Sequence, residues 1–402
     1  MSDIETLIPS AGQADTDALR AYDAEALARY VADPSHPWWR RRACARALAG
    51  RVPPAWVGAL LDRVRDVKDV GEVRRELLEI VGDRPELLPW LRHEDRRHEE
   101  SYGMPEAFLR TRGLVGDLTA ARELAVLAAD PWKRSQDAGE EALDALVERH
   151  GVDAVLGQLG EDRPEDRLFR LRMRYRADED VTYALADPDR MVAHLAHRLA
   201  QGDVDALRSF LTRAPTVESK LWAVLALHEL TEDLDETRRL YAELGSPRVE
   251  VPGLDEELRR PIVHEYVAWS QRLTDPRWRV EALCTEPPAP HDVEGWLHRA
   301  TEALTAAGLA PSPPVHCGPH NQQGDGTYHV IEFGDSEVRI STLGRFAFAY
   351  EGGRTARPAL EAAGFRWIDE ELEAITVTDL YVYYFGSRTP LTVDMLLFYW
   401  QD

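Results

Sequence analysis

The stretch GEVRRELLEIVGD, residues 71–83, decides the fold class of this chain. Its apolar residues recur at the three- and four-residue spacing of one helix face, and a glycine lies near each end. A related run, RRRACARALAG, occupies residues 40–50, and weaker relatives begin at residues 135, 190 and 218. Self-similar helical runs are typical of proteins built from repeated helix pairs. We therefore predict a mainly α-helical chain of stacked, antiparallel helix pairs.

Asp-Pro pairs separate several of these runs, at residues 33–34, 130–131, 187–188 and 275–276. Aspartate can cap the following helix, and proline ends one helix but is tolerated in the first turn of the next. An Asp-Pro pair, a short spacer and a Val-Arg helix ending in glycine together resemble a HEAT repeat, with Val73 and Arg74 at the characteristic positions. The resemblance covers roughly residues 15–285. It implies a HEAT-like α-solenoid, a fold that usually serves as a binding scaffold.

The last ninety residues have a different character, with 14 of the 33 aromatic residues and with alternating β-branched positions. TYHVIEF (327–333) and SEVRIS (336–341), joined by Gly334-Asp335, predict a hairpin, and RFAFAYE (345–351) predicts a third strand. AITVTDLYVYYF (374–385) and LTVDMLLFYW (391–400) predict a long apolar hairpin. We therefore expect a small α+β domain with an antiparallel sheet of about five strands.

The boundary between the two parts is predicted near residue 290. CTEPPAPHD (284–292) is rich in proline and suits a linker, and DVEGWLHRATEALTAAGLA (292–310) is an amphipathic helix that we assign to the second part. The predicted domains are thus a helical-repeat domain over 1–290 and an α+β domain over 291–402.

Composition limits the partners. The formal net charge of −23 disfavours nucleic acid, because binding to its backbone depends on neutralising phosphates with Lys and Arg. The same charge suits a basic protein partner. No apolar run approaches the ~20 residues that cross a bilayer, and the N-terminus lacks the pattern of a signal peptide. Three scattered cysteines (Cys44, Cys284 and Cys317) do not form a disulfide framework. We expect a cytoplasmic protein with no membrane partner.

Two stretches are candidate binding surfaces. HPWWRRRACARAL (36–48) places Trp38 and Trp39 beside arginines, where they could stack on and clasp a nucleotide. We favour another interpretation, in which one Trp packs between repeats and Arg41 takes the usual Arg position of the repeat. WIDEELEA (367–374) groups four acids that could face a basic protein or keep an apolar sheet soluble: Asp369, Glu370, Glu371 and Glu373.

Metal ligation and nucleophilic catalysis have only weak candidates. His194 and His197 share one helix face, but no third ligand can be named from the sequence. HCGPH contains His316, Cys317 and His320, which could hold a metal, activate the thiol, or form an ordinary loop. RHEDRRHEE (92–100) contains Glu94 and His98 on one face. No P-loop, GxGxxG, GxSxG, HExxH or CxxC motif occurs, so we predict no cofactor and no metal site.

A binding protein is the leading hypothesis, and an enzyme is the rival. The solenoid would supply an extended surface, and the acidity suits a scaffold that neutralises or regulates a basic protein, as an immunity protein does for a nuclease toxin. The rival is an enzyme with a site in the solenoid groove or at the domain junction. A third hypothesis, from the enzymatic branch of HEAT-like proteins, is a nucleic-acid glycosylase with a basic groove near Trp38.

Overall fold

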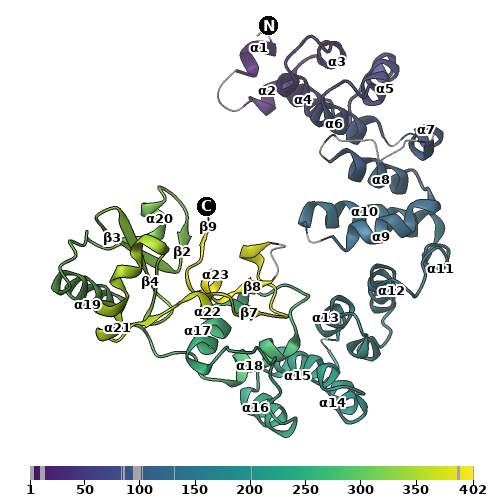
Figure 1. Cartoon of the computed structure of the whole chain (residues 1–402). Helices are drawn as coiled ribbons and strands as arrows, with labels where there is room; N and C mark the ends of the chain where they lie inside the picture. Colours follow the sequence, from purple (N-terminus) through teal and green to yellow (C-terminus); the bar gives the residue numbers. More distant parts are fainter. Residues whose placement is uncertain are drawn as a thin grey trace. The chain divides into compact units, whose positions relative to one another are not determined.

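The computed structural model describes residues 4–9, 14–82, 84, 87–93, 101, 103–130, 132–200, 202–386 and 390–401 (Figure 1). The chain is mainly helical and carries a mixed five-stranded sheet near its C-terminus. It divides into two compact units, Met1–Ala177 and Asp178–Asp402. None of the helices in the described ranges is long and apolar enough to cross a membrane.

The described part of unit 1 is helical, with turns between the helices. Its α-helices are α1 (Ile4–Leu7), α2 (Thr16–Ala21), α3 (Ala24–Ala32), α4 (Trp38–Ala47), α5 (Val57–Arg65), α6 (Gly71–Val81), α7 (Leu88–His93), α8 (Met104–Leu114), α9 (Ala121–Ala128), α10 (Lys133–His150), α11 (Val152–Leu156) and α12 (Pro164–Arg176). Helix α4 contacts α6, α6 contacts α8, and α8 contacts α10, while α3 and α5 pack beside them (Figure 1). Apolar side chains fill the space between these two rows, including Leu27, Val31, Leu60, Leu77 and Phe108.

An internal repeat is visible in the helix boundaries and in matching hydrogen bonds. Helices α4, α6 and α8 begin at residues 38, 71 and 104, so they start 33 residues apart. Arg41 on α4 donates from Nε to the carbonyl of Val31 at 2.9 Å. Arg74, 33 positions later on α6, donates from Nε to the carbonyl of Val64 at the same distance. The two buried arginines therefore make equivalent hydrogen bonds on helices that start 33 residues apart.

The Asp-Pro pairs act mainly as turns. In each pair the aspartate side chain accepts from the backbone N–H two residues later: Asp33 from Ser35, Asp130 from Trp132, Asp187 from Asp189, and Asp275 from Arg277. Only the last of these four aspartates is also the N-cap of the next helix, α18. The predicted capping role is therefore confirmed at Asp275, while the other three side chains close local turns.

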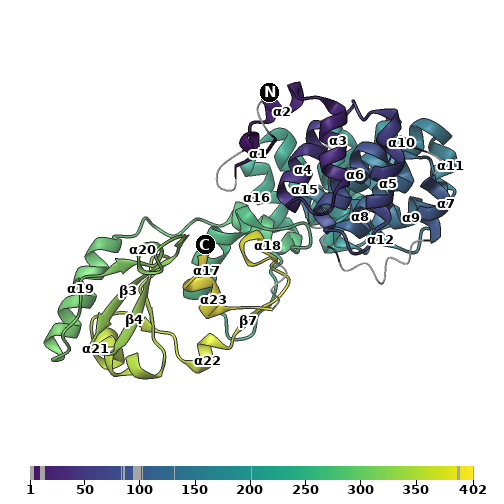
Figure 2. The same ribbon diagram turned by 90° about the horizontal axis from the view of Figure 1, so that it is seen from above.

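Unit 2 begins with helices and ends in short strands. Its α-helices are α13 (Arg190–Leu199), α14 (Val204–Arg213), α15 (Val217–Thr231), α16 (Leu234–Glu243), α17 (Glu256–Tyr266), α18 (Pro276–Cys284), α19 (Val293–Ala306), α20 (Cys317–His320), α21 (Arg357–Ala362), α22 (Glu370–Glu373) and α23 (Val393–Leu397). Its strands are β1 (Val315–His316), β2 (Asp325–Gly326), β3 (Tyr328–Phe333), β4 (Ser336–Ser341), β5 (Phe346–Phe348), β6 (Arg366–Trp367), β7 (Thr376–Val377), β8 (Leu391–Thr392) and β9 (Trp400–Gln401). Figure 2 shows the sheet with α19 and α21 near it.

The five-stranded sheet has the order β1-β3-β4-β5-β6. The predicted hairpin is confirmed as β3 and β4, which pair from Tyr328↔Ser341 to Phe333↔Ser336. The prediction of a wholly antiparallel sheet is wrong, because β5 and β6 pair in parallel. Helix α21 lies between them in the chain and carries it back, so that β6 runs in the same direction as β5.

The predicted long terminal hairpin forms only in part. Among the described residues of this stretch, β7 and β8 pair antiparallel through Thr376↔Thr392 and Val377↔Leu391, and the pairing does not extend further. Residues Tyr383–Phe385 form a 3₁₀ turn and α23 is helical. A short apolar run does not distinguish a buried strand from a buried helix, and here its side chains pack into a core on several sides.

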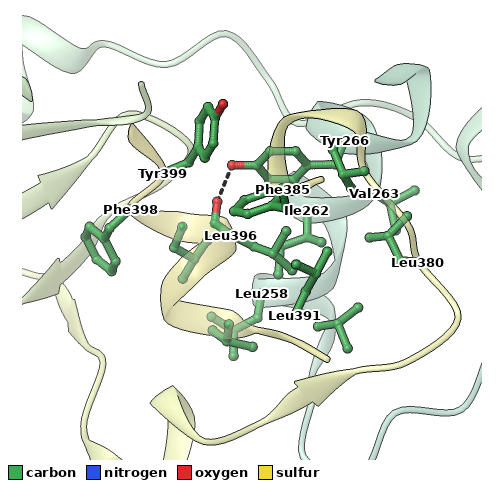
Figure 3. Close-up of a cluster of buried hydrophobic side chains, with 14 of the residues drawn as sticks. Leu258, Ile262, Val263, Tyr266, Leu380, Phe385, Leu391, Leu396, Phe398 and Tyr399 are labelled. Carbon is green, nitrogen blue, oxygen red and sulfur yellow. Dashed lines mark hydrogen bonds between the residues drawn. The ribbon is translucent and has the colours of Figure 1, made fainter. Parts of the chain in front are cut away.

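One hydrophobic core joins residues on both sides of position 290. Leu258, Ile262 and Tyr266 of α17 pack against Leu391, Leu396 and other side chains of the C-terminal segment (Figure 3). The Tyr266 hydroxyl donates to the Leu396 carbonyl at 2.5 Å. A second core joins Ala300 and Leu304 of α19 to β3, β4 and α21. The predicted domain boundary at 290 stays a prediction, but α17 and the C-terminal segment stabilise one another.

Candidate functional site

The central arginine of the first candidate surface is buried. Arg41 is 1% exposed, and its two terminal nitrogens donate to the Asp69 carboxylate at 2.7 and 2.6 Å. It therefore stabilises the repeat and is absent from any exposed surface. Trp38 and Trp39 are 38% and 43% exposed, and their rings meet edge to face.

The arginines beside Arg41 also have intramolecular partners. Arg40 donates to the carbonyl of Ile8 at 2.9 Å and pairs with Glu5 at 3.2 Å. Arg42 pairs with Glu76 on α6, and Arg46 donates to the same carboxylate. Most of the positive charge of HPWWRRRACARAL is thus neutralised within unit 1. These arginines therefore offer little unpaired positive charge to a nucleotide, which argues against a basic nucleotide-binding groove at Trp38.

The two histidines of α13 lie in one cluster, in which His197 is buried and His194 is partly buried. The rings of His194 and His197 are 5.6 Å apart, and each contacts the ring of Trp222 on α15. Nε2 of His197 is 3.0 Å from Glu229. Burial, and after it the positive charge of Arg279, lowers the pKa of His194 to about 3, so this histidine is neutral at pH 7.

Metal binding at these histidines lacks a ligand set. Within the part of the chain that the structure describes, no three His, Cys, Asp or Glu side chains form a group that could hold a metal ion. Trp222 and Arg279, which complete the cluster, come from α15 and α18 and are not metal ligands. Sequence spacing on α13 alone could not identify them. Glu94 and His98 lie outside the described residues.

The HCGPH segment forms β1 and the single turn α20. His316 caps this turn, because its Nδ1 accepts from the N–H of Gly318 at 3.3 Å. Cys317 Sγ lies 3.8 Å from His316 Nδ1. The thiol is fully buried, and burial raises its pKa, which opposes the thiolate that a nucleophile needs.

His320 has different neighbours from the other two side chains of HCGPH. Its ring nitrogens lie 3.8 Å from Glu332 on β3 and 3.6 Å from Glu337 on β4. His316 instead contacts the Gly326 carbonyl at 3.2 Å. These contacts describe a structured loop joining short strands, not a convergent catalytic group.

The acidic turn faces a cavity. Asp369 caps α22 by accepting from the N–H of Leu372 at 3.3 Å, and Arg357 lies 3.4 Å from its carboxylate. Glu370 pairs with Arg354 at 2.8 Å. Burial raises the pKa of Glu373, and the nearby carboxylates of Asp394 and Glu370 raise it further.

A cavity of about 330 Å³ lies against this turn. The four acids share its wall with Arg354, Arg357, Phe348 and Trp367. Four carboxylates against two guanidinium groups make the lining net negative. Because β5, β6 and α22 bring these residues together, the sequence could indicate the acids but not the cavity or its aromatic wall.

A larger cavity, of about 720 Å³, lies where α17 and α18 meet the linker, α19 and the turn between β4 and β5. Its lining mixes charges and rings, including Arg260, Glu281, Glu286, His291, Trp296 and Arg345. The rings of His291 and Trp296 are 4.8 Å apart, and Arg260 donates to the backbone carbonyl of Glu286 at 2.8 Å. This lining of charged groups and rings suits the binding of a charged molecule.

Comparisons with known proteins give no relative: no protein-family model, no curated protein and no solved structure matches the chain.

Proposed function

We propose that this chain is a cytoplasmic protein-binding scaffold whose helical part is a HEAT-like α-solenoid of antiparallel helix pairs. Its partner is a basic protein, which it neutralises or regulates as an immunity protein does. The 33-residue spacing of α4, α6 and α8 supports the repeat architecture. The equivalent hydrogen bonds of Arg41 and Arg74 support it independently of the helix boundaries.

The observation that carries the basic partner is the charge imbalance at the acidic turn. Arg354 and Arg357 pair with Glu370 and Asp369. No cation of the described residues forms an ion pair with Glu371 or Glu373. Burial raises the pKa of Glu373, and repulsion from the carboxylates of Asp394 and Glu370 raises it further. An incoming guanidinium or ammonium group would relieve that repulsion inside a cavity with an aromatic wall.

The test compares the full-length chain with the triple variant E370Q/E371Q/E373Q as baits in a native-host lysate. A matched control, D205N/E250Q/E294Q, removes three exposed carboxylates elsewhere in unit 2 and changes the net charge equally. Full-length baits are essential, because a chain cut at residue 290 would expose the core that Leu258, Ile262 and Tyr266 share with the C-terminal segment.

The proposal requires one basic protein that binds the wild type and the control in stoichiometric amounts but not the acidic-turn variant. Its binding must also weaken steeply as the salt concentration rises, since exposed charge pairs are screened. If a protein is retained and its binding changes neither with the triple variant nor with the salt concentration, the role of the acidic turn is contradicted.

The mixed-charge cavity of 720 Å³ favours a second candidate function, the binding or turnover of a charged small molecule at the junction of helices and sheet. If no protein is retained by any bait, a ligand screen with W296A and R345Q as cavity variants tests this alternative. A compound that stabilises the wild type but neither variant would support it.

A further inference from the structure

Arg75 on α6 is a buried cation with no ion-pair partner among the residues that the structure describes. Arg75 is 6% exposed, and its Nε is buried with no hydrogen-bond acceptor among the described residues. Its repeat neighbour Arg74 bonds to a backbone carbonyl, so the lack of a partner is specific to Arg75. A buried charge in this state is costly unless a counter-charge compensates it, and the described residues supply none.

A second guanidinium group converges on the same space. Nη1 of Arg75 lies 3.1 Å from the position that a Cβ on Gly103 would occupy, and Nη2 of Arg134 lies 3.4 Å from it. Arg134 is exposed, near the start of α10, and also has no ion-pair partner among the described residues. Two cations that face one small space repel each other, so the space favours an anion.

Among the described residues, the surrounding charges do not compensate this pair. Burial lowers the pKa of Arg75, and the charges of Arg134 and Arg42 lower it further. Glu76 and Glu79 act in the opposite direction. Glu76 is already bound by Arg42 and Arg46, and Glu79 lies beyond ion-pair distance of Arg75.

We propose that Arg75 and Arg134 form a binding site for a phosphate group, with Gly103 leaving the space that the oxyanion fills. Guanidinium groups bind phosphate oxygens through charge-assisted, often bidentate, hydrogen bonds. Arg75 supplies a desolvated donor and Arg134 an exposed one, so the ligand enters from the side of α10. Gly103 suits this place because its φ of +77° favours glycine, and a side chain would meet both guanidinium groups. This site lies in unit 1 and does not rest on the proposed function.

The test measures binding of inorganic phosphate to the full-length chain by calorimetry, at constant ionic strength with chloride as the balancing ion. We expect one saturable site. R75Q should weaken binding about tenfold or more, and R134Q about three- to tenfold, because each removes a charge-assisted contact. R20Q, an exposed arginine on α2 of the same unit, is the matched control and should bind as the wild type does.

Thermal stability gives a second test, because a purely structural role for Arg75 predicts a different result. In phosphate-free buffer R75Q should be at least as stable as the wild type, because the substitution removes an unpaired buried charge. Phosphate should then raise the melting temperature of the wild type but not that of R75Q. A parallel titration with phosphoserine separates free phosphate from a phosphoryl group on a larger molecule; saturation by either supports the site.

Two results would overturn the proposal. One is the absence of saturable binding of both probes to the wild type. The other is equal binding by R134Q, R75Q and the wild type, which would place the ligand elsewhere. R134Q alters an exposed side chain and should fold, so it decides the question even if R75Q does not fold.

Discussion

The hydrogen bond between Tyr266 and Leu396 gives a sharp prediction about how unit 2 is held together. Tyr266 is 1% exposed and lies on α17, and its hydroxyl donates to the carbonyl of Leu396 on α23 (Figure 3). Tyr266→Phe keeps the ring and so creates almost no cavity. It leaves a buried carbonyl without this donor, which costs about 1–3 kcal/mol.

That cost corresponds to a roughly fivefold to 150-fold increase in local opening, since each 1.4 kcal/mol is about tenfold in an equilibrium constant. Hydrogen exchange read by mass spectrometry should therefore lose protection in peptides spanning 256–266 and 391–401 together. Tyr383→Phe is the control, because the Tyr383 side chain is 73% exposed and should change protection little.

Loss of protection in the C-terminal peptide alone would refute the coupling of α17 to α23. A change no larger than that of Tyr383→Phe would refute the role of the hydrogen bond. Either result would mean that apolar contacts alone hold the C-terminal segment on α17.

Three further predictions concern charges and thiols. Glu281→Gln breaks a buried ion pair with Arg259, in which both nitrogen–oxygen distances are 2.7 Å. It should therefore lower the free energy of unfolding of unit 2 by about 3–5 kcal/mol in urea denaturation, and a loss below about 1 kcal/mol would contradict this. Burial raises the pKa of Asp117, but hydrogen bonds from Arg92, Thr119 and Arg112 outweigh burial and lower it. Its stabilisation of unit 1 is therefore present above the unfolded value of about 4 and is lost as pH falls below it, so Asp117→Asn should flatten the acid limb of a stability-against-pH curve. Burial raises the pKa of Cys44 to about 12 and that of Cys284 to about 11, and it also raises that of Cys317. All three thiols should react slowly with DTNB at neutral pH until the chain is denatured, and one that reacts equally fast in the native chain would contradict its raised pKa.

Local patterns predicted the elements whose formation depends on neighbours in sequence. The helical spacing of residues 71–83 predicted α6, and the alternation around Gly334-Asp335 predicted β3 and β4. The helix expected over 292–310 forms as α19. In each case the pattern extends over several turns or a full two-strand ladder, so short-range preferences suffice.

The same patterns failed where long-range packing decides. The apolar stretch after residue 374 was predicted as a hairpin, yet α23 forms there because its side chains fill a core beside α17. The parallel pairing of β5 and β6 depends on where α21 packs, which no local pattern contains. Arg41 matched the repeat motif, but only its bidentate pairing with Asp69 shows that it is unavailable for binding.

The sequence by itself determined the helical class, the repeat-like runs, the acidity and the positions of the acidic turn, because these depend on composition and nearby residues. The tertiary structure alone decided which charges are paired. It brings Arg75 and Arg134 to one space beside Gly103, and it separates His320 from the partners of His316. The physical reason is that the charge available at a surface depends on partners tens of residues away, and only folding brings those partners within a few ångströms.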